Sequence, residues 1–276
     1  VNDAAPTSII YSPSSFILTK GAQMQSVTPT AGGGAVVSWS ISPSLPNGLS
    51  IGESNGTIYG TPTAISPSTV YTITATNAGG SGDVTITMEV NDLPPHGIVY
   101  TDNPFTLTKG VPITPNTPTV QGGAVDSWSI SPQIPNGLIF SSSNGEISGT
   151  PTDITQSIVY TVTATNTGGS TTTTITIVVN DVIPSAISYS GSPFTLTKGT
   201  AMTTATPSAN GGAVETWSIT PGLPTGLNFD TSTGEISGTP STVSSSTVYT
   251  VTATNTGGSD STTIVIQIND AAPVIG

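Results

Sequence analysis

The sequence lacks cysteine and arginine, and its 276 residues include only three lysines and one histidine. Without cysteine, no disulfide can staple its domains. Fifteen carboxylates oppose the three lysines and give a formal charge of −12. Nucleic acids and anionic membrane surfaces both attract clustered Lys and Arg, which this chain does not have. We therefore expect no nucleic acid and no membrane surface among its partners.

Long apolar runs and dense charge are also missing. No apolar stretch approaches 18 residues, so we expect no membrane insertion by this segment. Charged residues make up only 7% of the chain, against about 25% in an average globular domain. The apolar 34% is mostly β-branched and falls in short alternating runs. Such a composition favours several small cores over one deep core.

The residues that are present repeat at an interval of 89. This interval separates the members of four sets: Trp39, Trp128 and Trp217; Lys20, Lys109 and Lys198; Tyr71, Tyr160 and Tyr249; Asn77, Asn166 and Asn255. A period of this length is typical of a whole small domain. We predict three domains, over residues 4–91, 93–180 and 182–269. Residues 1–6 and 269–273 both contain Asn-Asp-Ala-Ala-Pro, and we expect the chain to be a segment of a longer repetitive protein.

Within each copy the apolar pattern has a period of two, which is typical of half-buried strands. Tyr71, Ile73 and Ala75 share one face of such a strand, and threonines occupy the other face. Asn55-Gly56 and Asn144-Gly145 favour tight hairpin turns with positive φ. No helical periodicity is present. About seven short strands per copy predict an all-β sandwich of two sheets.

Two aromatic residues favour the immunoglobulin version of this sandwich. Immunoglobulin domains bury a Trp on the third strand and carry a Tyr two residues before the second Cys. Trp39 is the only Trp of its copy, and Tyr71 stands two residues before Ile73, which would replace the cysteine. We predict three tandem immunoglobulin-like β-sandwich domains in a rod. Their expected core residues are Trp39, Trp128, Trp217, Tyr71, Tyr160 and Tyr249.

A longer motif in each copy resembles the sequence pattern of a known family. Leu45-Pro46-Asn47-Gly48-Leu49 precedes Gly56-Thr57-Ile58-Tyr59-Gly60-Thr61-Pro62, and the pattern recurs in both later copies, with Ile134 as the first residue of the second. It resembles the immunoglobulin-like domain of large bacterial surface proteins and is similar to dystroglycan-type cadherin-like repeats. The resemblance covers nearly the whole chain. It implies an extracellular sandwich that serves as a spacer or adhesion module, including in adhesins, and that carries no chemistry of its own.

Catalytic residues do not recur. His96 has Thr7 and Ser185 at the equivalent positions, so a Ser-His-Asp triad lacks a repeated base. No pair of carboxylates recurs, and no Gly-Lys-Ser/Thr sequence completes a phosphate loop. We expect His96 to be an exposed linker residue and the protein not to be an enzyme.

The predicted junctions carry the only acidic position that recurs in every copy: Asp3, Asp92, Asp181 and Asp270. The cadherin-like resemblance implies calcium at such junctions, and the candidate ligands are Asp92, Asp181, Asn91 and Asn180. Calcium takes six to eight oxygens, whereas each junction offers one carboxylate and one Asn side chain. The alternative is that Asn-Asp ends a strand and starts a turn, with the following prolines stiffening the linker. We expect no other cofactor.

Two further patterns have alternative explanations. The one lysine of each copy lies in Leu-Thr-Lys-Gly, where it would either form an isopeptide bond or protect an edge strand from aggregation, and the second fits better because no buried carboxylate recurs. Threonines on the last two strands, such as Thr72, Thr74, Thr85 and Thr87, would form a ladder for ice or glycans. Strand propensity alone also explains them.

These patterns together predict structural stalk or spacer domains of a large extracellular adhesin, cell-surface or secreted, that project a distal binding domain. The alternative is that the repeats themselves bind a glycan, ice or another cell surface, with calcium stiffening the junctions. The expected partners are further copies of the repeat in the parent chain, and a cell-surface glycan or protein under the alternative.

Overall fold

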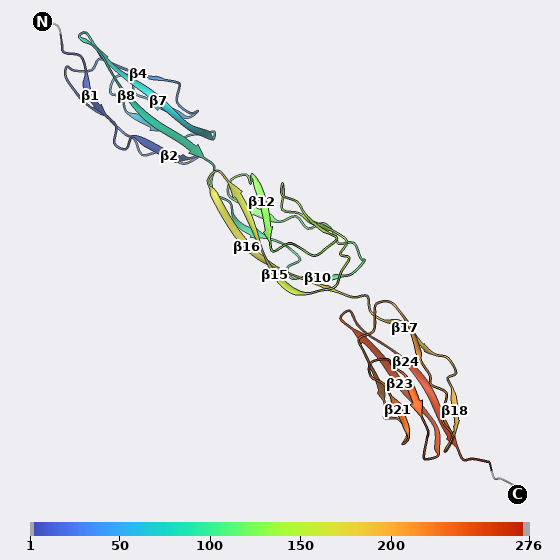
Figure 1. The fold of residues 1–276 in the computed structure, drawn as a ribbon. Coiled ribbons are helices and arrows are strands. Elements are labelled where there is room, and N and C mark those ends of the chain that lie inside the picture. Colours follow the sequence, from blue (N-terminus) through green and yellow to red (C-terminus); the bar gives the residue numbers. More distant parts are fainter. Residues whose placement is uncertain (1–2, 273–276) are drawn as a thin grey trace.

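The structure is a computed structural model that describes residues 3–272, and over this range it contains strands and no helix. Three domains follow one another along a rod, with the two ends of the chain at opposite tips (Figure 1). The predicted all-β class is confirmed, although each domain has eight strands instead of seven. The repeated Asn-Asp-Ala-Ala-Pro sequences extend outside the described residues at Asn2 and Pro273.

The strands occupy equivalent positions in the three domains. The first domain contains β1 (Thr7–Ile10), β2 (Ser15–Thr19), β3 (Thr30–Gly32), β4 (Ser38–Ser42), β5 (Leu49–Ile51), β6 (Ile58–Gly60), β7 (Ser66–Asn77) and β8 (Gly80–Asn91). The second contains β9 (His96–Val99), β10 (Phe105–Thr108), β11 (Thr119–Gln121), β12 (Ser127–Ser131), β13 (Leu138–Phe140), β14 (Ile147–Gly149), β15 (Thr155–Asn166) and β16 (Gly169–Asn180). The third contains β17 (Ser185–Tyr189), β18 (Phe194–Thr197), β19 (Pro207–Asn210), β20 (Thr216–Thr220), β21 (Leu227–Phe229), β22 (Ile236–Gly238), β23 (Ser244–Asn255) and β24 (Gly258–Asn269). The predicted domain limits themselves stay a prediction.

Each domain has two layers. In the first domain, one layer is a four-stranded sheet in the order β2-β8-β7-β4, in which β2 runs parallel to β8. In the other layer β1 pairs with β3 and β5 pairs with β6, and a bridge between Val27 and Ile58 joins the two pairs. The resulting orders are those of the two immunoglobulin sheets, ABED and CFG, with an extra edge strand beside G. The predicted immunoglobulin-like fold is confirmed.

The period-two pattern places a separate apolar cluster between the layers of each domain. Tyr71, Ile73 and Ala75 of β7 face this cluster, and Trp39 enters it from β4 with 6% of its surface exposed. Trp128 and Trp217 are equally buried, at 6% and 7%, in clusters of their own domains. Each indole is therefore part of a core formed within one copy of the repeat.

The loop between β5 and β6 is wider than the tight turn expected from Asn55-Gly56. Ile51 pairs with Ile58, which leaves residues 52–57 in the loop, and only Gly56 of the pair has a positive φ, at +69°. A Cβ on Gly56 would lie 2.7 Å from the indole of Trp39. Glycine is needed here for two reasons: the backbone passes directly over the buried tryptophan, and it has a left-handed conformation.

A tyrosine that the sequence did not single out completes this contact. The Tyr11 hydroxyl donates a hydrogen bond to the Gly56 carbonyl at 2.6 Å. The same bond, from Tyr100 to Gly145 and from Tyr189 to Gly234, is 2.5 Å long. Burial raises the pKa of all three hydroxyls above the ordinary tyrosine value, so they act as donors at any physiological pH.

One position in the first strand of every domain has a left-handed backbone. Ser8 has φ +47° and Ala186 has φ +52°, while the second domain has Gly97 there, with φ +66°. Such a conformation costs a residue with a Cβ about 1 kcal/mol or more. A Cβ on Gly97 would meet only the Gln121 side chain, 3.7 Å away, so a substitution there tests the backbone cost alone.

We expect Ala186→Gly to raise the free energy of unfolding of the third domain by about 0.5–1 kcal/mol, because it relieves this strain. Gly97→Ala should lower that of the second domain by about 1 kcal/mol for the reverse reason. Urea unfolding of both variants beside the parent chain measures the two shifts. A lower free energy of unfolding in Ala186→Gly would contradict the inference that the backbone is strained at this position.

Candidate functional site: the domain junctions

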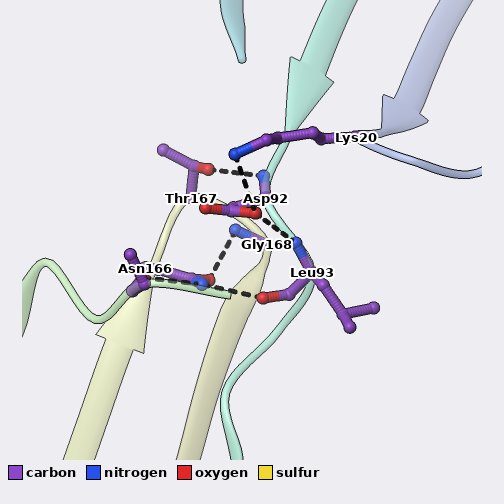
Figure 2. Close-up of polar contacts among 7 residues, drawn as sticks. Lys20, Asp92, Leu93, Asn166, Thr167 and Gly168 are labelled. Atoms are coloured by element: carbon purple, nitrogen blue, oxygen red, sulfur yellow. Dashed lines mark hydrogen bonds and ion pairs between the residues drawn. The ribbon is translucent and has the colours of Figure 1, made fainter. Parts of the chain in front are cut away.

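The chain passes from the first domain to the second through residues 92–95, and the second domain holds the start of this linker (Figure 2). The Asp92 backbone N–H donates to the Thr167 hydroxyl at 2.9 Å. The Asp92 carboxylate in turn accepts the N–H of Leu93 at 3.0 Å. Thr167 lies in the turn between β15 and β16, so this turn touches the last residues before the second domain begins.

Asn166, at the end of β15, is the centre of the attachment. Its side chain is 6% exposed. The amide nitrogen donates to the carbonyls of Leu93 (2.8 Å) and Ala124 (3.1 Å), and the amide oxygen accepts the N–H of Gly168 (2.9 Å). The Leu93 carbonyl also accepts the N–H of Gly123 at 3.0 Å. One buried side chain thus ties the linker to two loops of the following domain, and we call this arrangement the linker clamp.

Two bonds of the linker clamp recur in all three domains: the asparagine amide donates to the linker carbonyl and accepts the N–H of the glycine two residues on. Asn255 donates to the Val182 carbonyl at 2.8 Å, and Asn77 donates to the Ala4 carbonyl at 2.7 Å. The N–H of Asp181 donates to the Thr256 hydroxyl at 2.9 Å, as that of Asp92 does to Thr167. Each domain therefore fixes the segment that precedes its own first strand.

Close approach explains the glycine pairs on both sides of the clamp. A Cβ on Gly168 would overlap the carbonyl oxygen of Asp92. A Cβ on Gly123 would lie 2.6 Å from the Asp92 carboxyl carbon. Only glycine lets the two turns reach the linker at these distances.

The preceding domain contributes a lysine to the first junction. Lys20 follows β2, the edge strand of its sheet, and its backbone N–H donates to the Asn91 carbonyl at 2.8 Å. Its ammonium lies 3.9 Å from the Asp92 carboxylate, with the two side chains 44% and 17% exposed. A pair that is this accessible to solvent contributes at most about 1 kcal/mol.

The candidate calcium ligands lie at these junctions. Asn91 and Asn180 end β8 and β16, and Asp92 and Asp181 follow them directly. Among residues 3–272, no three His, Cys, Asp or Glu side chains come together as a metal site would require. The ammonium of Lys20 already supplies Asp92 with a positive charge. The donor set falls short of the six to eight oxygens of calcium, and the calcium site stays a prediction.

We expect EDTA and added calcium to give melting temperatures that agree within about 1 °C, because each junction offers one carboxylate and one Asn side chain where calcium takes six to eight oxygens. A site filled at 100 times its dissociation constant would add about 2.7 kcal/mol and raise the melting temperature by about 10 °C or more. Differential scanning calorimetry in the two buffers separates the outcomes. A calcium-dependent rise that Asp92→Asn abolishes would establish the site.

The outer faces of the four-stranded sheets carry the threonines expected to form a ladder. In the second domain, Thr161 pairs with Thr174 and Thr163 with Thr172. In the first domain Thr74 lies opposite Asp83, to whose carboxylate its hydroxyl donates at 2.7 Å. The ladder is therefore continuous in one domain and interrupted in another, so the three copies present different faces.

His96 differs from its expected place. It is exposed as predicted, but it is the first residue of β9 and not part of the linker. Within the described residues 3–272, no helix is long and apolar enough to cross a bilayer.

Sequence comparison matches each of the three copies to a known family. A family model described as "Putative Ig domain" matches residues 2–91, 94–180 and 177–269. The "Serine-rich adhesin for platelets" of Staphylococcus aureus is 34% identical over 151 residues, which are 54% of this chain and 6% of that protein. The version in strain MRSA252 has the same identity, over 11% of its length. The matched segment is thus a small part of these relatives.

Solved structures with a similar arrangement have low sequence identity. A variant of titin domains I67–I69 covers 99% of this chain and 98% of its own, with 16% identity and a TM-score of 0.47. The eight N-terminal Ig domains of the Down Syndrome Cell Adhesion Molecule cover 97% of this chain and 37% of their own, with 17% identity and a TM-score of 0.44. Because both scores lie below 0.5, the fold assignment rests on the strand order and the family model.

Proposed function

We propose a function from one premise: this chain belongs to the Ig-domain family whose model matches each of its three copies. The three domains act as a stalk in a large extracellular adhesin. They hold a distal binding domain away from the cell surface, and their contribution is distance. The name of the staphylococcal relative, an adhesin for platelets, supports this setting outside the cell.

The end-to-end arrangement of the domains is the observation that carries the proposal (Figure 1). The longest strands of each domain have 12 residues and span about 40 Å. Three such domains in line exceed about 100 Å. Each one buries its own tryptophan cluster, so further copies add length without needing a new core.

The pairing of β2 with β8 suits a stalk under tension. The chain enters each domain through β1, which pairs with β3 in the other layer, continues into β2 and leaves the domain from β8. β2 and β8 are parallel from the Ser15–Thr87 pair to the Thr19–Asn91 pair. Forces on the two ends of a domain therefore slide these strands past each other. Their hydrogen bonds are loaded together, and none can break alone as in an unzipping hairpin. The same parallel pair recurs in the second and third domains.

Replacing the three domains within the parent protein tests the proposal. We expect their deletion to abolish attachment of cells to their target, and an unrelated rigid spacer of equal length to restore it. If the spacer fails and the isolated three-domain fragment binds the target surface, the repeats themselves are the binding module. Small-angle X-ray scattering of the fragment should give a maximum dimension above about 100 Å.

A further inference from the structure

The two junctions of the rod have equivalent clefts of unequal size. Both lie between the start of one long strand, the end of the next, and the turn of the following domain. The first cleft, between Ile65 and Thr167, has a volume of about 240 Å³. The second, between Ile154 and Thr256, has a volume of about 510 Å³ and also reaches Glu215. The cleft at the second junction is therefore about twice as large as the cleft at the first.

Only the first junction is closed by an ion pair. The Lys20 ammonium lies 3.9 Å from the Asp92 carboxylate, which connects the first domain to a residue that the second domain holds (Figure 2). Lys109 and Asp181 are the equivalent residues of the second junction. Among residues 3–272, Lys20–Asp92 is the only such contact within 4.0 Å. The smaller cleft and the ion pair thus occur at the same junction.

The linker sequences favour the same difference. The first linker reads Leu93-Pro94-Pro95 and the second reads Val182-Ile183-Pro184. Proline fixes its own φ and restricts the residue before it to extended conformations. Pro94 therefore restricts Leu93 and fixes its own φ in the first linker, whereas in the second linker Pro184 restricts Ile183 and no proline follows Val182.

We propose that this rod has one stiff junction and one hinge. The Lys20–Asp92 pair holds the first two domains as a single body. The third domain swings about the step from Asn180, which the second domain holds, to Asp181, which the third domain holds. The lysine of each copy thus restrains its junction only where the linker brings the next aspartate within ion-pair distance. This proposal rests on the stalk function, since bending matters only for a protein that works by its reach.

Distances between spin labels at one equivalent position of each domain test the proposal. The chain has no cysteine, so Thr85→Cys with Thr174→Cys reports the first junction and Thr174→Cys with Thr263→Cys reports the second. All three threonines are exposed on β8, β16 and β24. Pulsed electron paramagnetic resonance should give a narrow distance distribution for the first pair and a broad one for the second.

Removing the ion pair should loosen the first junction alone. Lys20→Gln, and Asp92→Asn, which keeps the oxygen that accepts the Leu93 N–H, should reduce the closed population by up to about five-fold. About 0.5 M NaCl should act like either variant, because it screens an exposed pair, while Lys20→Arg should keep the narrow distribution. Lys109→Gln is the matched control, which should leave both junctions unchanged.

Distance distributions of equal width at the two junctions of the parent chain would overturn the proposal. So would a first junction that Lys20→Gln leaves unaltered, or a second junction that Lys109→Gln broadens. These outcomes are independent of the spacer experiment. If the spacer fails to restore attachment while the labels behave as expected, the stalk function is wrong and the stiffness of the first junction still holds.

Discussion

Replacing Trp128 by alanine should lower the free energy of unfolding of the second domain by about 3–5 kcal/mol, the cost of removing a buried Trp or Phe side chain. The indole is 6% exposed and belongs to a cluster made only of residues from its own domain. A single domain is stable by about 5–15 kcal/mol in total, so this loss brings the second domain close to unfolding. The first and third domains should keep their stability, because they do not share this core.

The remaining tryptophans make the measurement direct. Trp39 and Trp217 report only on the first and third domains, so their fluorescence transition in urea should not change in Trp128→Ala. Circular dichroism should show about a third of the β signal melting earlier. Trp128→Phe is the control, since it keeps an aromatic ring in the cluster and should cost much less. A lower urea midpoint for the Trp39 and Trp217 fluorescence transition would mean that the three copies depend on one another for folding.

Much of this fold follows from local patterns. The 89-residue interval gives the number of domains, and the alternation along β7 and β8 gives the face that is buried. The tryptophan position is typical of an immunoglobulin sandwich. These features are readable because each depends on residues that are neighbours in the sequence or equivalents in a repeat.

Contacts between distant segments were harder to predict. The tyrosine assigned from the immunoglobulin pattern, Tyr71, is buried, but Tyr11 is the one that hydrogen-bonds the glycine beside the indole. Both recur every 89 residues, so the repeat marks them equally and only the fold shows which hydroxyl meets a carbonyl. The ion pair of Lys20 with Asp92 spans two domains. No spacing rule predicts such a contact, because the linker angle decides it.

Asn166 illustrates the same difference at the junction. The repeat marked Asn77, Asn166 and Asn255 as constant positions, and Asn-rich turns are ordinary at the end of a strand. Its role emerges only when the linker is in place, since two of its three bonding partners, Leu93 and Ala124, lie 73 and 42 residues away. Asp92, the acidic residue of the junction, was the more obvious candidate from the sequence, and its backbone is bonded to Thr167, beside Asn166.

Asn166→Ala should therefore destabilise the second domain by about 2–4 kcal/mol. It removes three hydrogen bonds, of about 1 kcal/mol each, and leaves the Ala124 carbonyl and the Gly168 N–H without their buried partner. The Leu93 carbonyl keeps its bond from Gly123, so the linker should loosen without leaving the domain. Hydrogen exchange should become faster at Gly168 and at Asp92, whose N–H is bonded to the neighbouring Thr167.

The same substitution elsewhere in the domain separates the clamp from the general cost of losing an asparagine. Asn144 is exposed, in the loop between β13 and β14, and its side chain makes one bond, to the N–H of Glu146 at 3.2 Å. Asn144→Ala should cost less than about 1 kcal/mol, since water replaces the lost partner. Equal losses in the two variants, measured by urea unfolding of the whole chain, would mean that the clamp adds nothing to ordinary turn chemistry. A larger loss in Asn166→Ala, with faster exchange confined to the linker side, follows only if the buried amide joins each domain to the segment that precedes it.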